Sequence, residues 1–325
     1  MRIAFVGKGG SGKTTITSLL FRYLENMNKP LLAIDADINQ HLAGSVAWDA
    51  ESPPELGNNL KELKKILKGI NQKIPSESEM IKTTLPGAGS HLIKLDAQDP
   101  VLDRFAVNKK NAWLMRIGGF MEDDIGQKCY HAKTGAAELI LNHLVDSGEE
   151  TIIMDMTAGA DAFASGLFGR FDLTVLVVEP TMKSVSVYNQ YKDYAKEYEI
   201  PVVVVGNKVE DANDIAFLEE KCSNDLIGCV TKSAWVKQTE QGRAPEITSF
   251  EPENTKILEK ILHEANKYPR DWNKYWALGR KFHLLNATGW ANDALGCDVT
   301  NQIDNDFLRK FQGMNFEQFV ENNQL

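Results

Sequence analysis

The chain has few cysteines, no long apolar run and no excess of positive charge. Four cysteines in 325 residues are too few for a disulfide framework, and none of them forms a close Cys-x-x-Cys pair. No apolar stretch approaches the length of about 20 residues that a transmembrane helix needs, and no signal peptide precedes the first apolar run. The net charge of −9 argues against broad nucleic-acid binding, because phosphate contacts need clustered lysine and arginine. We therefore expect a cytoplasmic protein with no membrane and no nucleic-acid partner.

Short apolar runs bounded by turn residues recur along most of the chain. They are continuous rather than alternating, which is typical of parallel strands covered on both faces. The expected strands are Ile3–Val6, Leu31–Ile34, Thr151–Met154, Leu173–Val178, Pro201–Val205 and Leu226–Val230. Apolar residues at three- and four-residue steps lie between them, notably in residues 16–27, 60–70 and 139–145. Strands that alternate with helices predict a doubly wound α/β fold with a mostly parallel sheet.

Two stretches depart from this alternation. Residues 52–111 are irregular and rich in proline, glycine and lysine, and we expect one or two helices there. Beyond about Tyr268 the chain changes to aromatic residues set among polar ones, without strand alternation. We predict one α/β domain in residues 1–265 and a C-terminal helical extension in residues 266–325. The aromatic residues of the extension are expected to pack it onto the domain.

A glycine-rich loop follows the first expected strand and opens a helix. Its sequence, Gly7-Lys-Gly-Gly-Ser-Gly-Lys-Thr14, satisfies the pattern GxxxxGK[ST] of P-loop nucleotide triphosphatases. The glycines let backbone N–H groups approach a phosphate, and the helix adds its positive N-terminal end. Lys13 would neutralise phosphate charge, and the Thr14 hydroxyl would ligate magnesium. The predicted nucleotide-binding residues are Gly9, Gly10, Ser11, Gly12, Lys13, Thr14 and Thr15.

A lysine directly after the first glycine is not needed for an ordinary P-loop. With Lys8, the loop resembles the deviant Walker A family. That family includes MinD, ParA, arsenite-pump-type ATPases, the nitrogenase iron protein and the CooC-type nickel-insertion ATPases. The resemblance implies a homodimer in which Lys8 reaches the partner's nucleotide, so that dimerisation and ATP hydrolysis are coupled.

Carboxylates follow two of the expected strands. Asp35 and Asp37 end the second strand, and Asp155 follows an apolar strand in the Walker B pattern. By resemblance, Asp37 orients the attacking water, Asp35 lies beside the loop as a magnesium ligand, and Asp155 holds a magnesium-bound water. Asp37 and Gly159 are then expected to belong to two switches that respond to the γ-phosphate.

Asn207 and Lys208 follow a later strand, at the usual position for base recognition. An asparagine amide can pair with the edge of adenine through its donor and acceptor groups. The guanine-specific pattern NKxD has aspartate at its fourth position, where this chain has Glu210. The sequence therefore favours ATP over GTP.

Three stretches beyond the loop resemble the CooC-type branch in particular. They are Asp155–Gly159, Val177–Ser184 and Val205–Val209, and the resemblance covers roughly Met1 to His263. It implies an ATPase that delivers nickel to a client metalloenzyme, for example one resembling carbon monoxide dehydrogenase.

That branch carries a Cys-x-Cys pair at its dimer interface, and here the matching residues are Cys129 and His131. Cysteine and histidine both bind nickel and zinc, so two subunits would supply a Cys₂His₂ set for Ni²⁺ or Zn²⁺. Histidine in place of the second cysteine departs from the branch pattern, and a structural role for both residues is the alternative.

Other functions of this family need features that the chain lacks. A cluster-bearing reductase like the nitrogenase iron protein needs two cysteines around the second switch, and only Cys129 is near it. Membrane attachment of the MinD kind needs a basic amphipathic C-terminal helix, whereas the last 25 residues carry more acidic than basic side chains. The alternative that stays open is an ATP-gated adaptor without metal, which would use the aromatic extension as its docking surface.

Overall fold

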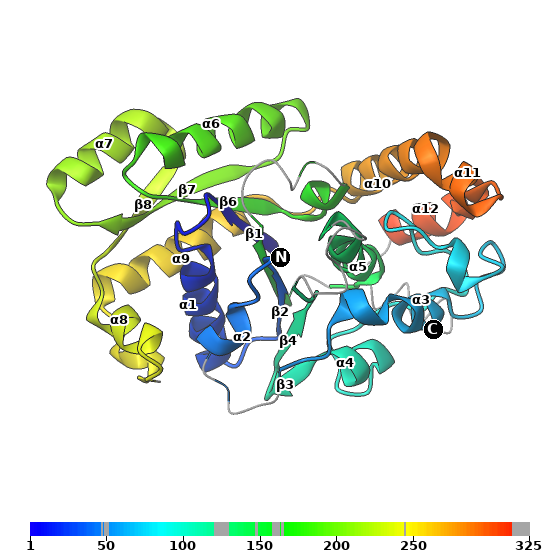
Figure 1. Cartoon of the computed structure of the whole chain (residues 1–325), viewed down its shortest axis with the longest axis horizontal. Helices are drawn as coiled ribbons and strands as arrows, with labels where there is room; N and C mark the ends of the chain where they lie inside the picture. The colour runs from blue at the N-terminus through cyan, green and yellow to red at the C-terminus, as the bar shows by residue number, and fades with distance from the viewer. Residues whose placement is uncertain are drawn as a thin grey trace.

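A central sheet organises the part of the chain that the computed structural model describes, residues 1–46, 48, 52–119, 130–146, 149–157, 163, 166–243 and 245–313. Side chains are described for these residues except 130–132 and 311–313. The sheet is eight-stranded, in the order β3-β4-β2-β5-β1-β6-β7-β8 (Figure 1). The strands are β1 (Arg2–Gly7), β2 (Leu31–Ala36), β3 (Val107–Lys109), β4 (Ala112–Arg116), β5 (Thr151–Met156), β6 (Leu173–Val178), β7 (Val202–Val209) and β8 (Leu226–Thr231).

All six expected strands are confirmed, with ends within a few residues of those predicted. Their pairing is parallel throughout, and only β3 runs antiparallel to its neighbour β4. The sequence did not predict β3 and β4. The first is three residues long, and the second is a five-residue apolar run too short to show a period. The place of β4 is set by its parallel pairing with β2, a long-range contact that no local pattern specifies.

Helices cover both faces of the sheet (Figure 1). The helices are α1 (Lys13–Asn26), α2 (Leu42–Ser45), α3 (Leu60–Lys68), α4 (Pro100–Phe105), α5 (Tyr130–His143), α6 (Met182–Glu197), α7 (Ala212–Cys222), α8 (Ala234–Glu240), α9 (Pro252–Asn266), α10 (Trp272–Asn286), α11 (Asn292–Leu295) and α12 (Asn305–Gly313). Shorter turns are the 3₁₀ helices η1 (Leu56–Asn59), η2 (Glu77–Glu79), η5 (Gly166–Arg170), η6 (Ser223–Asp225), η7 (Ile247–Ser249) and η9 (Val299–Gln302), and the π-helix η8 (Ala287–Ala291). None of the described helices is long and apolar enough to cross a membrane.

Alternate side chains of each central strand enter different cores. In β1, Ile3 and Phe5 pack with α1, α8 and α9, whereas Ala4 and Val6 pack with α3, α5, α6 and α7. Because both faces are covered, every position of the strand is buried, and its residues Ile3–Val6 form a continuous apolar run in the sequence. The predicted doubly wound fold is confirmed.

The C-terminal region is helical, as expected. Its helices α10 and α12 pack beside a segment around Leu85 and Leu92 rather than over the phosphate loop. Tyr275 and Trp276 are buried in this contact, whereas Trp290 is 48% exposed. The expectation that aromatic residues pack the extension therefore holds for α10 and not for η8.

Buried ion pairs hold the start of α10 against the amino edge of the sheet, where β1 and β6 begin. Arg270 donates to both oxygens of Asp146 (2.5 and 2.7 Å) and to both oxygens of Asp172 (2.9 and 2.8 Å). Arg2 donates to Asp146 from the opposite side, at 3.0 and 3.2 Å. Burial alone would raise the pKa of Asp146, but the two guanidinium groups hold it well below its usual range.

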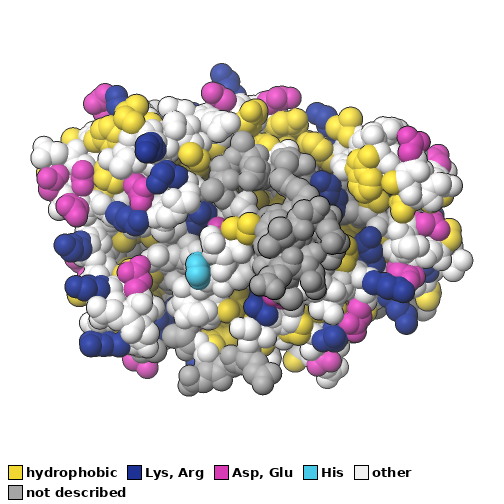
Figure 2. Space-filling view, viewed as in Figure 1, with side chains coloured by type: hydrophobic (Ala, Val, Ile, Leu, Met, Phe, Trp, Pro, Cys, Tyr) yellow, Lys and Arg dark blue, Asp and Glu magenta, His cyan; other side chains and the backbone are white. Residues whose placement is uncertain are grey.

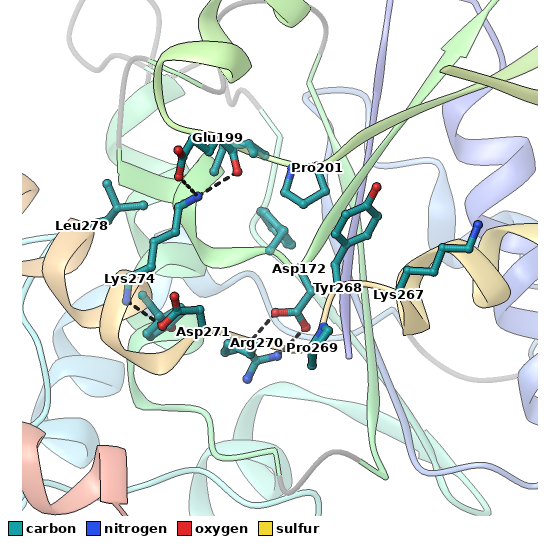
Figure 3. Close-up of a pocket in the computed structure, with 14 residues that line it drawn as sticks. Asp172, Glu199, Pro201, Lys267, Tyr268, Pro269, Arg270, Asp271, Lys274 and Leu278 are labelled. Carbon is teal, nitrogen blue, oxygen red and sulfur yellow. Dashed lines mark hydrogen bonds and ion pairs between the residues drawn. The ribbon is translucent and has the colours of Figure 1, made fainter. Parts of the chain in front are cut away.

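A pocket of about 420 Å³ lies beside these ion pairs (Figure 3). It is lined by Asp172 and Pro201, where β6 and β7 begin, and by the segment that enters α10, whose Lys274 donates to Glu199. The pocket is therefore at the amino edge of the sheet, opposite the edge where the glycine-rich loop follows β1.

Replacement of Arg270 by methionine should destabilise the whole fold. It leaves Asp146 and Asp172 buried without their main partner, and loss of one member of a buried pair lowers the free energy of unfolding by about 3 kcal/mol. Urea unfolding followed by circular dichroism measures this change. Arg309→Met, at a guanidinium that is 74% exposed, serves as the control and should change the value by less than about 0.5 kcal/mol. Equal urea midpoints for Arg270→Met and wild type would contradict the structural importance of the network.

Candidate nucleotide-binding site

The glycine-rich loop connects the end of β1 to the start of α1, as the sequence predicted. Two of its glycines, Gly10 (φ 81°) and Gly12 (φ 96°), have left-handed backbone conformations that disfavour other residues. A side chain at Gly12 would also overlap the amide nitrogen of Asn207. Inside the turn, the Ser11 hydroxyl oxygen is buried without a hydrogen-bond partner. The loop therefore has the backbone of a phosphate cradle and a buried polar atom without a partner.

Parallel pairing brings the predicted polar residues together at the carboxyl edge of the sheet. Lys13 is 5% exposed, and its Nζ lies 3.6 Å from Oδ2 of Asp37, which follows β2. The Thr14 hydroxyl donates to Oδ2 of Asp155 in β5 at 2.5 Å. Asp35 and Asp155 are directly opposite each other in the β2–β5 pairing. Residues far apart in the sequence thus form one site because β2, β5 and β1 are neighbours.

The carboxylates of this site are buried with little compensating charge. Burial raises the pKa of Asp155 to about 8, and Asp35 and Asp37 add to that rise while the Thr14 hydrogen bond opposes it. Burial also raises the pKa of Asp35 to about 7, against hydrogen bonds from the backbone of Leu42 and Asp37. Oδ1 of Asp155 is buried without a hydrogen-bond partner. An added cation would relieve these costs, and oxygen atoms are the ligands that magnesium prefers.

These residues fit magnesium only in combination with a nucleotide. No group of three or more His, Cys, Asp or Glu side chains in the described ranges is arranged to hold a metal ion by itself. Magnesium, however, is commonly bound through one or two protein groups together with substrate phosphates and water. Thr14 and Asp155, with Asp35 behind them, supply such a partial set.

Lys8 forms an ion pair within its own chain. Its Nζ is 3.3 Å from Oε2 of Glu179, the residue after β6, and its side chain is 35% exposed. Oε1 of Glu179 also accepts a hydrogen bond from Lys208 at 2.8 Å. Burial alone would raise the pKa of Glu179, but the two lysines hold it below its ordinary value. The sequence did not single out Glu179, although its position after a strand at the carboxyl edge was a usable signal.

Asn207 and Lys208 contact the loop itself. The Asn207 amide, 8% exposed, donates to the carbonyl oxygen of Ser11 at 2.8 Å. Lys208 has a positive φ of 57° and donates to the carbonyl oxygen of Gly10 as well as to Glu179. A strained conformation in a non-glycine residue is common where side chains are held for function. Both residues therefore support the shape of the loop, and a role in base recognition stays a prediction.

A second pocket, of about 280 Å³, opens beside Thr15 at the start of α1. It is lined by residues of α1, α2 and α8, among them Ser18, Gly44, Trp235 and Thr239. This pocket is adjacent to the phosphate loop and offers room for further parts of a nucleotide.

Three predicted residues cannot be placed. Cys129 and Gly159 lie outside the described residues, and His131 belongs to α5 but its side chain is not described. The remaining predicted site residues lie in the loop, at the ends of β2 and β5, or in β7.

Fold and site together define a P-loop nucleotide-binding protein of the doubly wound α/β class. Residues 3–242 match the model of the CobQ/CobB/MinD/ParA nucleotide binding domain. The chain therefore belongs to that family.

Known relatives agree with this assignment. The carbon monoxide dehydrogenase accessory protein CooC of Rhodospirillum rubrum is 28% identical over 245 residues, which are 74% of this chain and 87% of that protein. An uncharacterised ATP-binding protein of Methanocaldococcus jannaschii is 27% identical over 81% of this chain and 96% of its own length. A ParA family ATPase from Chlorobium tepidum shares the fold with a TM-score of 0.56 at 14% identity, covering 81% of this chain and 97% of its own.

The variant Asn207→Ala distinguishes two roles of the Asn207 amide: support of the phosphate loop and recognition of the nucleotide base. If the amide mainly holds the Ser11 carbonyl, the variant should bind ATP and GTP more weakly by a similar factor, on the order of tenfold. Isothermal titration with both nucleotides measures the two affinities, and Asn266→Ala, at an exposed position ending α9, is the control. A large loss for ATP with none for GTP would show that the amide contacts the base instead.

Proposed function

We propose that this protein is a magnesium-dependent ATPase that works as a homodimer and gates the delivery of a metal ion to a client metalloenzyme. The observation that supports the ATPase is the meeting of Lys13 with Asp37 and of Thr14 with Asp155 at one edge of the sheet. The proposal places the protein in the cytoplasm. It treats residues 1–265 as the ATPase domain and residues 266–325 as its C-terminal helical extension.

Each residue of the site has its own role in ATP hydrolysis. Loop amides and Lys13 bind the phosphates. Thr14, Asp35 and Asp155 would hold magnesium, which would supply positive charge to the phosphates. Asp37, whose carboxylate lies 3.6 Å from Lys13 Nζ, orients a water for in-line attack on the γ-phosphorus. The water oxygen bonds to phosphorus as the bond to the β–γ bridging oxygen breaks, and ADP leaves.

Lys8 completes the site from the partner subunit. To reach the partner's nucleotide it must leave Glu179, which holds it within its own subunit in this structure. Closure of the dimer exchanges that ion pair for one with phosphate, so hydrolysis depends on association. Asp37 and Gly159 belong to the two switches that respond to the γ-phosphate.

The metal cargo is inferred from the relationship to CooC. That relative is a carbon monoxide dehydrogenase accessory protein, and three stretches of this chain resemble its branch of the family. We assign Cys129 and His131 of both subunits as the ligands that hold nickel, or zinc, between them. The client is then an enzyme that needs this metal.

Two lysine substitutions test the ATPase mechanism. Lys13→Ala should abolish nucleotide binding, because it removes the buried counter-charge of the phosphates. Lys8→Ala should keep binding but lose ATP-dependent dimerisation, with turnover falling by about 10³-fold. Phosphate release and light scattering report turnover and mass, and Lys183→Ala, at an exposed position in α6, is the control. Wild-type turnover in Lys8→Ala would refute action of that lysine across the dimer.

Metal binding is tested by anaerobic titration of nickel and of zinc into the purified protein, with and without a non-hydrolysable ATP analogue. We expect one metal ion per dimer, with an affinity that changes when the nucleotide binds. Cys129→Ala should lose the metal, whereas Cys297→Ala, in the extension, should keep it. Tight nucleotide binding with no bound metal in wild type would remove metal delivery from the proposal.

The alternative function is an ATP-gated adaptor without metal. It is favoured by exposed apolar side chains on the extension: Leu284 is 42% exposed, Leu285 55% and Trp290 48%. Figure 2 shows hydrophobic side chains on the right-hand part of the visible face, over α10 and α11. An adaptor would hydrolyse ATP normally after Cys129→Ala, and it would lose partner binding after Trp290→Ala.

A further inference from the structure

Helix α10 packs against the segment that leads from the second switch to β6. That segment, η5 (Gly166–Arg170), is entirely buried. It begins about ten residues after Asp155 in the sequence. The face of α10 that contacts it presents side chains at helical spacing: Tyr275, Leu278, Gly279 and Phe282. Since the family match ends at residue 242, α10 lies outside the part of the chain that the family model covers.

The contact is close because glycines lie on both sides of it. A Cβ on Gly166 would come within 3.1 Å of Phe282, and one on Gly169 within 3.2 Å of Leu278. A Cβ on Gly279 would come within 3.2 Å of the Arg170 guanidinium. At such distances the two elements have no room to slide past each other, so a displacement of η5 displaces α10.

An aromatic chain extends the same contact toward the switch. Phe163 lies 4.6 Å from Phe168, measured between ring centroids, and Phe168 lies 5.4 Å from Phe282 in an edge-to-face arrangement. Phe163 also contacts Tyr191 of α6 at 4.7 Å. Phe163, Phe168 and Phe282 are thus packed in succession as far as α10.

Arg170 brings to this contact a buried guanidinium with open hydrogen-bonding positions. It is 1% exposed, its guanidinium lies 4.2 Å from the centroid of the Tyr275 ring, and its Nε and Nη1 have no hydrogen-bond partner. Glu138 of α5 is 2% exposed, and its Oε2 also has no partner. Burial raises the pKa of Glu138 to about 7, although Arg170 and Lys82 oppose that rise.

A buried charged group that lacks hydrogen-bond partners lowers the stability of the fold. A small movement that brings the Arg170 guanidinium and the Glu138 carboxyl into hydrogen-bonding contact therefore lowers the free energy. In the arrangement observed here, the Arg170 guanidinium stacks on Tyr275 of α10. The same guanidinium attracts the Glu138 carboxylate. A hydrogen bond from Arg170 to Oε2 of Glu138 would satisfy an open position on each group.

We propose that Arg170 and the contacting face of α10 couple the nucleotide site to the C-terminal extension. When the γ-phosphate binds or leaves, the Arg170 side chain exchanges its contact with Tyr275 for a hydrogen bond to Glu138, and this exchange changes the packing of α10 on η5. Arg170 is a positioning residue in this scheme, because it touches no substrate. The inference rests on nucleotide binding as proposed above, but not on metal delivery or on the action of Lys8.

Hydrogen exchange in the full-length protein tests the coupling. Exchange is measured by mass spectrometry over residues 272–286, without nucleotide, with ADP and magnesium, and with a non-hydrolysable ATP analogue and magnesium. Coupling between sites commonly amounts to about fivefold or more, so the ATP analogue should change amide exchange in α10 by at least that factor relative to ADP. Isothermal titration on the same samples gives the affinity for each nucleotide.

Arg170→Met should remove the difference in α10 exchange between the two nucleotides, while each still binds within about threefold of its wild-type affinity. Gly279→Ala displaces the Arg170 guanidinium without removing it, and it should reduce the difference in α10 exchange between the two nucleotides. This second variant tests the proposal even if Arg170→Met does not fold. Arg309→Met, at an exposed arginine of α12, is the matched control and should retain the full response.

Each outcome has a distinct meaning. Nucleotide binding with the same α10 exchange in all three states overturns the coupling and leaves the proposed ATPase intact. A full response in both Arg170→Met and Gly279→Ala overturns the role of Arg170. Failure of the wild-type protein to bind any nucleotide overturns the proposed function and the coupling together.

Discussion

Parallel pairing of β1 with β5, and of β5 with β2, is the constraint on which the site depends. It places the carboxyl ends of three strands side by side, so that the phosphate loop, Asp37 and Asp155 meet although Asp155 is more than a hundred residues from the other two in the sequence. The sheet is covered on both faces, and every position of β1, β2 and β5 is buried, which fixes the register of these three strands. The loop is shaped by Gly10 and Gly12 in left-handed conformations and by hydrogen bonds from Asn207 and Lys208 to its carbonyl oxygens.

Charge is distributed unevenly between the two edges of the sheet. At the amino edge, Arg2 and Arg270 satisfy Asp146 and Asp172 with close hydrogen bonds, and this network joins the start of α10 to the strands. At the carboxyl edge, Asp35 and Asp155 are buried with raised pKa values and an oxygen atom without a partner. The first arrangement stabilises the fold by itself, whereas the second is completed only by added ligands.

The C-terminal helices relate to both edges through different contacts. Arg270 fixes the beginning of α10 rigidly, while the middle of the helix contacts η5 through glycines and a guanidinium whose hydrogen bonds are incomplete. The start of α10 is therefore held by satisfied ion pairs, whereas its middle packs closely on η5 beside a guanidinium with open hydrogen-bonding positions. This physical difference is why we place the coupling at Arg170 rather than at the ionic network.

The sequence by itself determined the fold class and the identity of the phosphate loop, because both depend on local patterns. These patterns are the continuous apolar runs, the helical spacing and the glycine-lysine-threonine motif between the first strand and the first helix. It did not reveal β3 and β4, which are short and exist through their pairing with β2. Nor did it reveal that Glu179 holds Lys8, that Asn207 lies on the loop carbonyl, or that α10 contacts η5. Those contacts join residues distant in the chain, and only tertiary packing decides which distant side chains become neighbours.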